Sequence, residues 1–225
     1  MTPISHGPNI WSIPHSHKVA GLLPLGTRTT IVRLHDGALL LHSPGPLSAE
    51  ELEHIRQMGD VRVLFAPNLE HVLFLDVVID AFPDAELWGP TALDASKDHL
   101  DHHQDISDPP WKGALVAIAV KGVPRLQETV FIHPESRSLI FADLSFNIQS
   151  ADGWFNRLML RMAGAYGTFG PSHLFKGYFL SDRAAFKASL DQILQHDFDQ
   201  VILAHGDVVA EGGKDGLRDA FAFLD

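Results

Sequence analysis

Residues 48–88 constrain the fold of this chain most, because helical and strand patterns alternate along them. Ser48 followed by Glu51 forms a capping box that starts a helix. A nearly continuous apolar run follows, as expected of a strand buried on both faces, and the next apolar residues recur at helical spacing until Pro83 stops them. The expected elements are a helix, a strand, a helix and a strand over about 48–58, 61–65, 71–82 and 86–88. This alternation is typical of a layered α/β sheet.

Further strand patterns lie on both sides of this segment. Runs rich in β-branched, aromatic and other apolar residues occupy 9–13, 28–34, 38–42, 115–120, 129–132, 138–142 and 200–204. If the turn 134–137 is unpaired, His133 faces Ser138 and Glu128 faces Asp143 across a hairpin. Helical patterns over 182–195 and 215–224 follow. We therefore expect a single domain, residues 1–225, of class α/β (α+β) with mixed sheets.

Composition excludes several classes of site and partner. The chain has 225 residues, a formal net charge of -11 and no cysteine. The negative charge argues against nucleic acid or an anionic membrane as a partner. Without cysteine, a metal must be bound by His, Asp or Glu. The sequence shows neither a signal peptide nor an apolar run of the ~18 residues that a spanning helix needs, so we expect a soluble, cytoplasmic protein.

Residues that can bind a metal follow three of the expected strands. Glu70 and His71 come after strand 61–65, Asp143 after strand 138–142, and His205 after strand 200–204. Functional groups of layered α/β sheets gather at the carboxyl ends of strands. Carboxylates and imidazoles without sulfur suit Zn, Fe or Mn, and an incomplete shell leaves room for an activated water.

With Ala142-Asp143 and Ala204-His205-Gly206 ending the later strands, the chain resembles the metallo-β-lactamase superfamily over almost its whole length. It looks closest to a divergent branch. The resemblance implies an αββα four-layer sandwich, a site for one or two metals at the sheet edges, and mostly hydrolytic chemistry.

The sequence departs from the family's pattern at one half of that site. The His-x-His-x-Asp-His loop of the family lies on Ala66-x-Asn68-x-Glu70-His71, so both histidines of the first metal site are replaced. Glu128 is the nearest substitute for the family's next histidine, and Ser43-Pro44-Gly45 stands where the family has Asp-Thr-Gly. The resemblance thus implies a second-site set, with Asn68 orienting water or substrate beside Asp143. The predicted ligands are Glu70, His71, Asp143, His205 and Glu128.

Residues 150–180 form a predicted lid or loop segment within the domain. It starts with a possible amphipathic helix and carries bases that would suit an anionic or carbonyl-bearing substrate. The alternative is that Arg157 and Arg161 form the solvent-exposed polar face of that helix. The predicted substrate-binding residues are Arg157, Arg161, His173 and Lys176.

Three functions are consistent with these patterns. The first is a metal-dependent hydrolase with one divalent metal, zinc before iron or manganese, acting on an ester, lactone or thioester of a small molecule. The second is a descendant without metal that binds a small molecule or a protein partner. The third is a mononuclear iron redox protein. No sequence feature specifies an oligomeric state.

Overall fold

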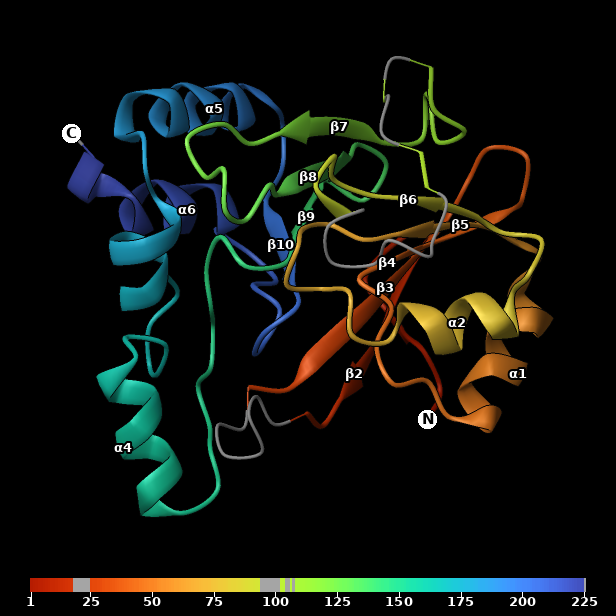
Figure 1. Ribbon diagram of the computed structural model, residues 1–225, viewed down its shortest axis with the longest axis horizontal. Helices are drawn as coiled ribbons and strands as arrows, with labels where there is room; N and C mark the ends of the chain where they lie inside the picture. Colours follow the sequence, from red (N-terminus) through yellow and green to blue (C-terminus); the bar gives the residue numbers. More distant parts are fainter. Residues whose placement is uncertain (18–24, 94–101, 104–105, 107, 225) are drawn as a thin grey trace.

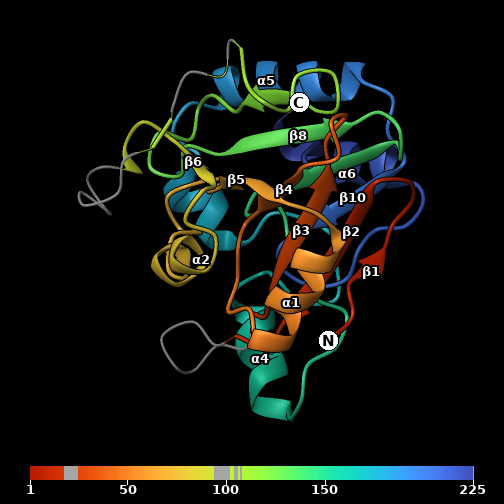
Figure 2. The same cartoon turned by 90° about the vertical axis from the view of Figure 1, so that its right-hand side faces the viewer.

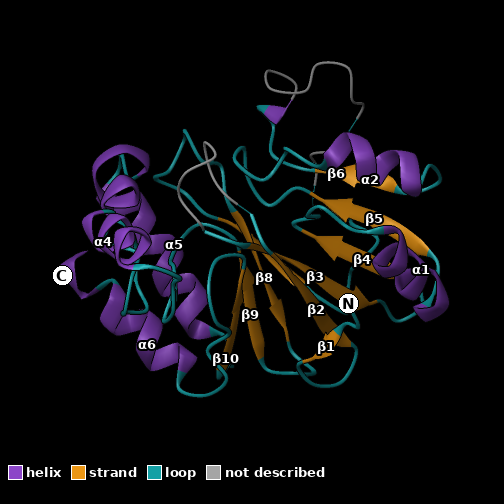
Figure 3. Cartoon of the chain, turned by 90° about the horizontal axis from the view of Figure 1, so that it is seen from below, coloured by secondary structure: helices purple, strands orange, loops and turns teal. Residues whose placement is uncertain are grey.

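The chain folds into four layers, two sheets packed face to face with helices on both outer sides (Figures 1 and 3). The computed structural model describes residues 1–17, 25–93, 102, 103, 106 and 108–224. The first sheet has the order β1-β2-β3-β4-β5-β6. Its strands are β1 (Ile4–Ser5), β2 (Ile10–His15), β3 (Thr27–Arg33), β4 (Leu39–His42), β5 (Val61–Phe65) and β6 (Glu86–Trp88).

The second sheet has the order β10-β9-β8-β7. Its strands are β7 (Val116–Ala119), β8 (Thr129–His133), β9 (Ser138–Phe141) and β10 (Gln200–Leu203). Both sheets are mixed, since β4 pairs parallel with β5 and β10 parallel with β9, while the hairpins are antiparallel.

Helices cover the two outer faces. The helical elements are α1 (Ala49–Met58), α2 (Leu75–Ala81), α4 (Trp154–Met162), the π-helix η1 (Phe175–Phe179), α5 (Arg183–Gln195), α6 (Gly213–Ala220) and the 3-10 turn η2 (Ala222–Leu224). Figure 3 shows α1 and α2 on the side of the first sheet and α5 and α6 on the side of the second. In Figure 2, α1 lies across the face of β2 and β3.

Three apolar layers hold these elements together. Between the sheets, Phe65, Trp111 and Phe131 pack with ring centroids 4.6 to 5.4 Å apart. A second cluster joins the first sheet to α1 and α2, and a third joins the second sheet to α5 and α6. Because each sheet is covered on both faces, the residues of its central strands are almost all buried.

Most of the expected elements form where the sequence predicts them. The Ser48 capping box starts α1, the strand over 61–65 has the expected bounds, and His133 pairs with Ser138 across the hairpin. The four-layer sandwich with mixed sheets is confirmed. The helix expected over 71–82 begins later, at Leu75.

Asn68 fixes the turn between β5 and α2. The side-chain Oδ1 of Asn68 accepts hydrogen bonds from the backbone N–H groups of Glu70 (2.9 Å) and His71 (3.0 Å). These bonds to the second and third following N–H groups have the pattern of a helix N-cap, and they fix the turn that leads into α2. The chain therefore turns around Asn68 before α2 begins, and this turn aims His71 at the sheet edge.

Candidate metal centre

Three predicted ligands meet where β5, β9 and β10 end. His71 Nε2 lies 3.1 Å from Asp143 Oδ2, and His205 Nε2 lies 3.1 Å from Asp143 Oδ1. The two Nε2 atoms are 3.3 Å apart. As expected for residues that follow strands of a layered sheet, these three side chains come from distant parts of the chain and lie within reach of a single ion.

The ring orientation of His205 is fixed from outside the cluster. Its Nδ1 lies 2.7 Å from the carbonyl oxygen of Gly26, and a carbonyl can only accept, so Nδ1 carries the proton. The Phe146 ring stacks on the imidazole at a centroid distance of 5.2 Å. A neutral His205 therefore points the lone pair of Nε2 at the Asp143 carboxylate. That arrangement is repulsive unless a cation or a proton lies between the two groups.

Arg28 holds the chain on either side of His205. Its guanidinium donates to the carbonyl oxygens of Leu203 and Gly206, the latter at 2.7 Å. Burial lowers the pKa of Arg28, and Asp207 partly opposes this shift. Gly26 directly precedes β3 and Arg28 lies at its start, so the first sheet positions a ligand that follows a strand of the second sheet.

His71 is oriented by Ser43, at the turn after β4. The Ser43 hydroxyl lies 2.6 Å from His71 Nδ1, so this nitrogen is engaged and Nε2 faces the cluster. The Ser43 hydroxyl thus supplies a polar contact at the turn that the resemblance sets against the family's Asp-Thr-Gly. The Ser43 backbone has a φ of 54°, a left-handed conformation.

Asn68 and Glu128 support Asp143 from below. The Asn68 Nδ2 donates to Glu128 Oε2 at 2.7 Å and to Asp143 Oδ2 at 2.8 Å. The Glu128 carboxylate also accepts from the backbone N–H groups of Ala142 and Asp143. Burial, followed by the nearby Asp143 charge, raises the pKa of Glu128 to about 8. Both polar side-chain atoms of Asn68 are therefore used to fix the Asp143 loop and the turn at His71.

The charge on Asp143 is stabilised by the imidazoles. Burial alone would raise its pKa, but His71 and His205 outweigh burial and hold the pKa of Asp143 well below its usual range. An ionised carboxylate between two imidazole nitrogens is the donor set expected for a divalent transition metal. Tetrahedral ligands about 2.0–2.1 Å from a zinc ion lie roughly 3.3 Å apart, close to the 3.1, 3.1 and 3.3 Å found here. The three side chains therefore fit such an ion.

The other predicted ligands lie outside this trio. Glu70 is exposed at the cavity lining, where burial and then Asp143 raise its pKa, while His71 partly opposes the shift. The Glu128 carboxylate is turned toward Asn68 and the backbone. Ala66 and Asn68, which stand where the family has its first-site histidines, are fully buried, and Ala66 packs in the apolar layer under α2.

A cavity of about 530 Å³ opens onto the cluster. His71, Asp143 and His205 supply one polar end. The rest of its wall is largely apolar and comes from the turn before α2 and from the segment that ends in η1; its apolar members include Leu69, Val72, Leu73, Phe74, Phe146, Leu174, Phe175 and Phe179.

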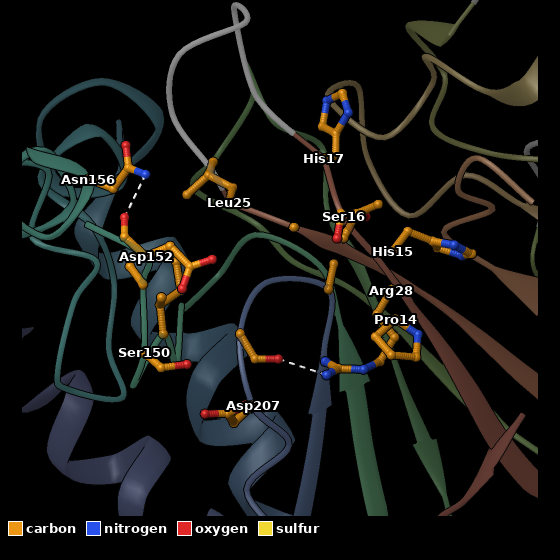
Figure 4. Close-up of a pocket in the computed structure, with 16 residues that line it drawn as sticks. Pro14, His15, Ser16, His17, Leu25, Arg28, Ser150, Asp152, Asn156 and Asp207 are labelled. Carbon is orange, nitrogen blue, oxygen red and sulfur yellow. Dashed lines mark hydrogen bonds between the residues drawn. The ribbon is translucent and has the colours of Figure 1, made fainter. Parts of the chain in front are cut away.

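A second cavity, of about 740 Å³, lies beside the first (Figure 4). His17, Leu25 and Thr27 line both cavities. Figure 4 shows the second cavity between the end of β2 and the stretch before α4, with Arg28 below it.

The predicted lid segment is ordered into α4 and η1. Among the described residues, Ser172, Leu174, Phe175 and Phe179 of this segment line the cavity at the cluster, whereas Arg157, Arg161, His173 and Lys176 do not. The Arg161 guanidinium stacks over Tyr166, the Lys176 ammonium over Phe223, and His173 Nδ1 faces the carbonyl of Met162. These contacts direct three of the four predicted substrate-binding side chains elsewhere.

Sequence reasoning missed the residues that orient the ligands. Ser43 could have been found, because it follows a strand as the ligands do. Gly26 acts through its backbone carbonyl, which no side-chain pattern reveals. Arg28 lies at the start of a strand, where a basic residue usually indicates an exposed end.

The four-layer fold and the His/Asp/His cluster define a protein of the metallo-β-lactamase fold. Solved structures with this fold include the metallo-beta-lactamase FIM-1 from Pseudomonas aeruginosa in its mono-zinc form, with a TM-score of 0.64, 12% identity, and coverage of 99% of this chain and 92% of the other. The metallo-beta-lactamase from Pontibacter korlensis has a TM-score of 0.62, 11% identity, and coverage of 99% and 97%. At these identities the likeness concerns the fold alone. No curated protein matches the sequence.

In sequence, the family profile described as "Domain of unknown function (DUF4336)" matches residues 8–155, well over half of the chain. The chain belongs to this family, and its fold is that of the metallo-β-lactamases. Among the described residues, no helix is long and apolar enough to cross a membrane.

Proposed function

We propose that this chain is a hydrolase that holds one divalent metal, zinc before iron or manganese, through His71, Asp143 and His205. The observation that carries the proposal is the orientation of the two imidazoles. Each Nδ1 is bound on its far side, by Ser43 or by Gly26, and each Nε2 faces the same carboxylate. Such outer contacts fix the tautomer and direction of a metal-binding histidine.

The bound metal would supply Lewis acidity, which polarises a carbonyl and makes water a stronger acid. The residues of this chain supply the rest. Asp143 balances the charge and is held by Asn68, which acts as a positioning residue because it is fully buried below the site. The apolar wall of the 530 Å³ cavity excludes water and receives the apolar part of a substrate. An ester, lactone or thioester with an apolar acyl group fits this lining.

The test is elemental analysis of the protein purified without a histidine tag. We expect about one metal ion per chain, and loss of that metal in His71→Ala and in His205→Ala. His196→Ala is the matched control, because His196 is a half-buried histidine at the end of α5 and lies outside the cluster. Metal that is substoichiometric in the wild type and unchanged in both site variants would refute the proposal.

A panel of esters, lactones and thioesters then tests the chemistry. We expect turnover by the wild type that a chelator abolishes and added metal restores. If the metal-bound protein hydrolyses no ester, lactone or thioester, the metal site remains supported but the proposed hydrolase function is refuted.

A second candidate is a protein without metal that uses the cavity for binding. The buried Ala66 and Asn68 favour it, because both positions that would hold the first metal are committed to packing or hydrogen bonding. The absence of metal together with retained binding of apolar small molecules would support this function. Iron in place of zinc, with redox activity, would support the mononuclear iron alternative.

A further inference from the structure

Helix α4 turns an apolar face away from the rest of the protein. Its large apolar side chains are exposed, with Trp154 at 71% and Met162 at 65% of their full accessible area. The exposed apolar residues of this helix are Trp154, Phe155, Leu158, Met159 and Met162. Figures 1 and 2 show α4 at the periphery, apart from the sheets.

The five exposed residues form a single stripe. At 3.6 residues per turn, positions 154, 155, 158, 159 and 162 fall within an arc of roughly 140°. Leu160, which is fully buried against Phe146 and Ile148, lies on the opposite side. An amphipathic helix of a soluble domain normally buries its apolar stripe. Here a single leucine anchors the helix, and the stripe faces outward.

The charge of this region is opposite to that of the rest of the chain. Residues 153–181 contain no Asp or Glu, but they contain Arg157, Arg161 and Lys176. The remainder has 14 Lys and Arg against 28 Asp and Glu, a formal charge of -14. The net charge of the whole chain, which argued against an anionic surface as partner, is the sum of two regions of opposite sign.

Arg157 and Arg161 lie beside the apolar stripe, one turn apart on the helix. This is the arrangement of a helix that lies in a membrane interface, where apolar and aromatic residues enter the acyl boundary and basic residues remain at the headgroups. We propose that α4 docks the protein onto a lipid surface that carries anionic headgroups. The inference does not depend on the metal centre.

A second copy of the chain fits the stripe less well. In a symmetric contact the arginines of both copies would approach each other, and residues 153–181 offer no acid to pair with them. The helix has nine residues, so it is about 13 Å long and offers far less than the ~800 Å² per partner of a stable interface. A lipid surface needs no complementary shape and accepts a short helix.

Vesicle binding tests this proposal. The full-length protein is mixed with vesicles of phosphatidylcholine alone or of equal parts phosphatidylcholine and phosphatidylglycerol, and binding is followed by co-sedimentation and tryptophan emission. Trp88 and Trp111 are buried and Trp11 is half-buried, so the exposed Trp154 reports entry into lipid. We expect binding to the mixed vesicles and a shift of the emission to shorter wavelength.

Two double variants separate the apolar and the ionic contributions. Trp154→Ser/Met162→Ser should weaken binding by about tenfold or more, because two large side chains no longer enter the acyl boundary. Arg157→Gln/Arg161→Gln should lose about fivefold per arginine on the mixed vesicles only. Ile4→Ser is the matched control, since Ile4 is also exposed (49%) but lies on β1, and it should bind as the wild type does.

Three results would overturn the proposal. The first is a wild-type protein that binds neither kind of vesicle. The second is binding that persists unchanged in Trp154→Ser/Met162→Ser. The third is a dimer, seen by sedimentation velocity without lipid, that the same variant abolishes, because the stripe would then be a contact between copies. Unchanged thermal unfolding of each variant shows that the fold is intact.

Discussion

Replacing Asn68 with alanine tests the hydrogen-bond network below the candidate metal centre. The substitution removes two donors to carboxylates, at 2.7 and 2.8 Å, and the acceptor of two backbone N–H groups. Net contributions are about 1 kcal/mol for a neutral hydrogen bond and about 1.5–3 kcal/mol for one to a charged group. Since Asn68 is fully buried, water restores little of this. The pKa of Glu128 is raised to about 8, so its bond counts as neutral, and three neutral bonds with one bond to the ionised Asp143 give a loss of roughly 5 kcal/mol.

The loss should be visible in stability and in metal binding. For a chain of this size, roughly 5 kcal/mol corresponds to a decrease in Tm of about 10–20 °C. The loss of a residue that orients a metal ligand typically lowers metal affinity by about 10- to 100-fold. Thermal unfolding followed by circular dichroism gives the first quantity, and competition with a chelator gives the second.

A matched control is Asn156→Ala. Asn156 donates a single exposed hydrogen bond to the carbonyl of Asp152, so we expect a change within about 0.5 kcal/mol. If Asn68→Ala has the same Tm and the same metal affinity as Asn156→Ala, Asn68 does not support the metal centre.

Three further predictions concern other parts of the molecule. Arg28→Leu leaves the carbonyls of Leu203 and Gly206 without their donor, so it should lower the free energy of unfolding by about 2–4 kcal/mol and weaken metal binding. Arg28→Lys should recover only part of this loss. Full activity and stability of Arg28→Leu would contradict the role of Arg28 in holding the chain around His205. Burial lowers the pKa of His42 from 6.5 to about 3. As the pH falls, the unfolded chain binds this proton first. The contribution of His42 to the free energy of unfolding is therefore complete above pH 6.5 and decreases by roughly 3 kcal/mol toward about pH 4. In denaturant unfolding, His42→Phe should flatten the dependence of this free energy on pH, and an unchanged dependence would refute the role given to His42. Gly122 has a φ of +81°, and an added Cβ would lie 2.2 Å from the Asp182 carbonyl. Gly122→Ala should therefore cost at least about 2 kcal/mol, whereas Gly177→Ala, with open space around the Cβ, should be nearly neutral in the same assay.

The fold was predictable because its signals are local. The capping box at Ser48 and the apolar run 61–65 each depend on residues a few positions apart, and both elements formed as predicted. The start of α2 was not predicted, because residues 71–74 form a turn although their apolar residues continue the helical spacing. Periodicity alone does not distinguish a turn from the first turn of a helix.

The candidate site was predictable only in part, for a related reason. His71, Asp143 and His205 could be named because each follows a strand. Which of the nearby carboxylates faces the cluster depends on side-chain direction, and Glu128 turns toward Asn68 and the Asp143 backbone instead. The segment 154–180 was harder, since the bases that suggest an anionic substrate lie outside the cavity lining that the structure describes.

Asn68 and Glu128 explain how the Asp143 loop is held although the first-site histidines are replaced. The Asn68 amide lies between two buried carboxylates, and the Glu128 carboxylate receives the N–H of Asp143. Removing either side chain alone takes one of several buried hydrogen-bond partners from the other, so each single variant includes a desolvation penalty. If the two residues act as a unit, Asn68→Ala/Glu128→Ala should cost less than the sum of the single variants, with a coupling energy of about 1–3 kcal/mol. Additivity within about 0.5 kcal/mol would mean that Asn68 and Glu128 support Asp143 independently.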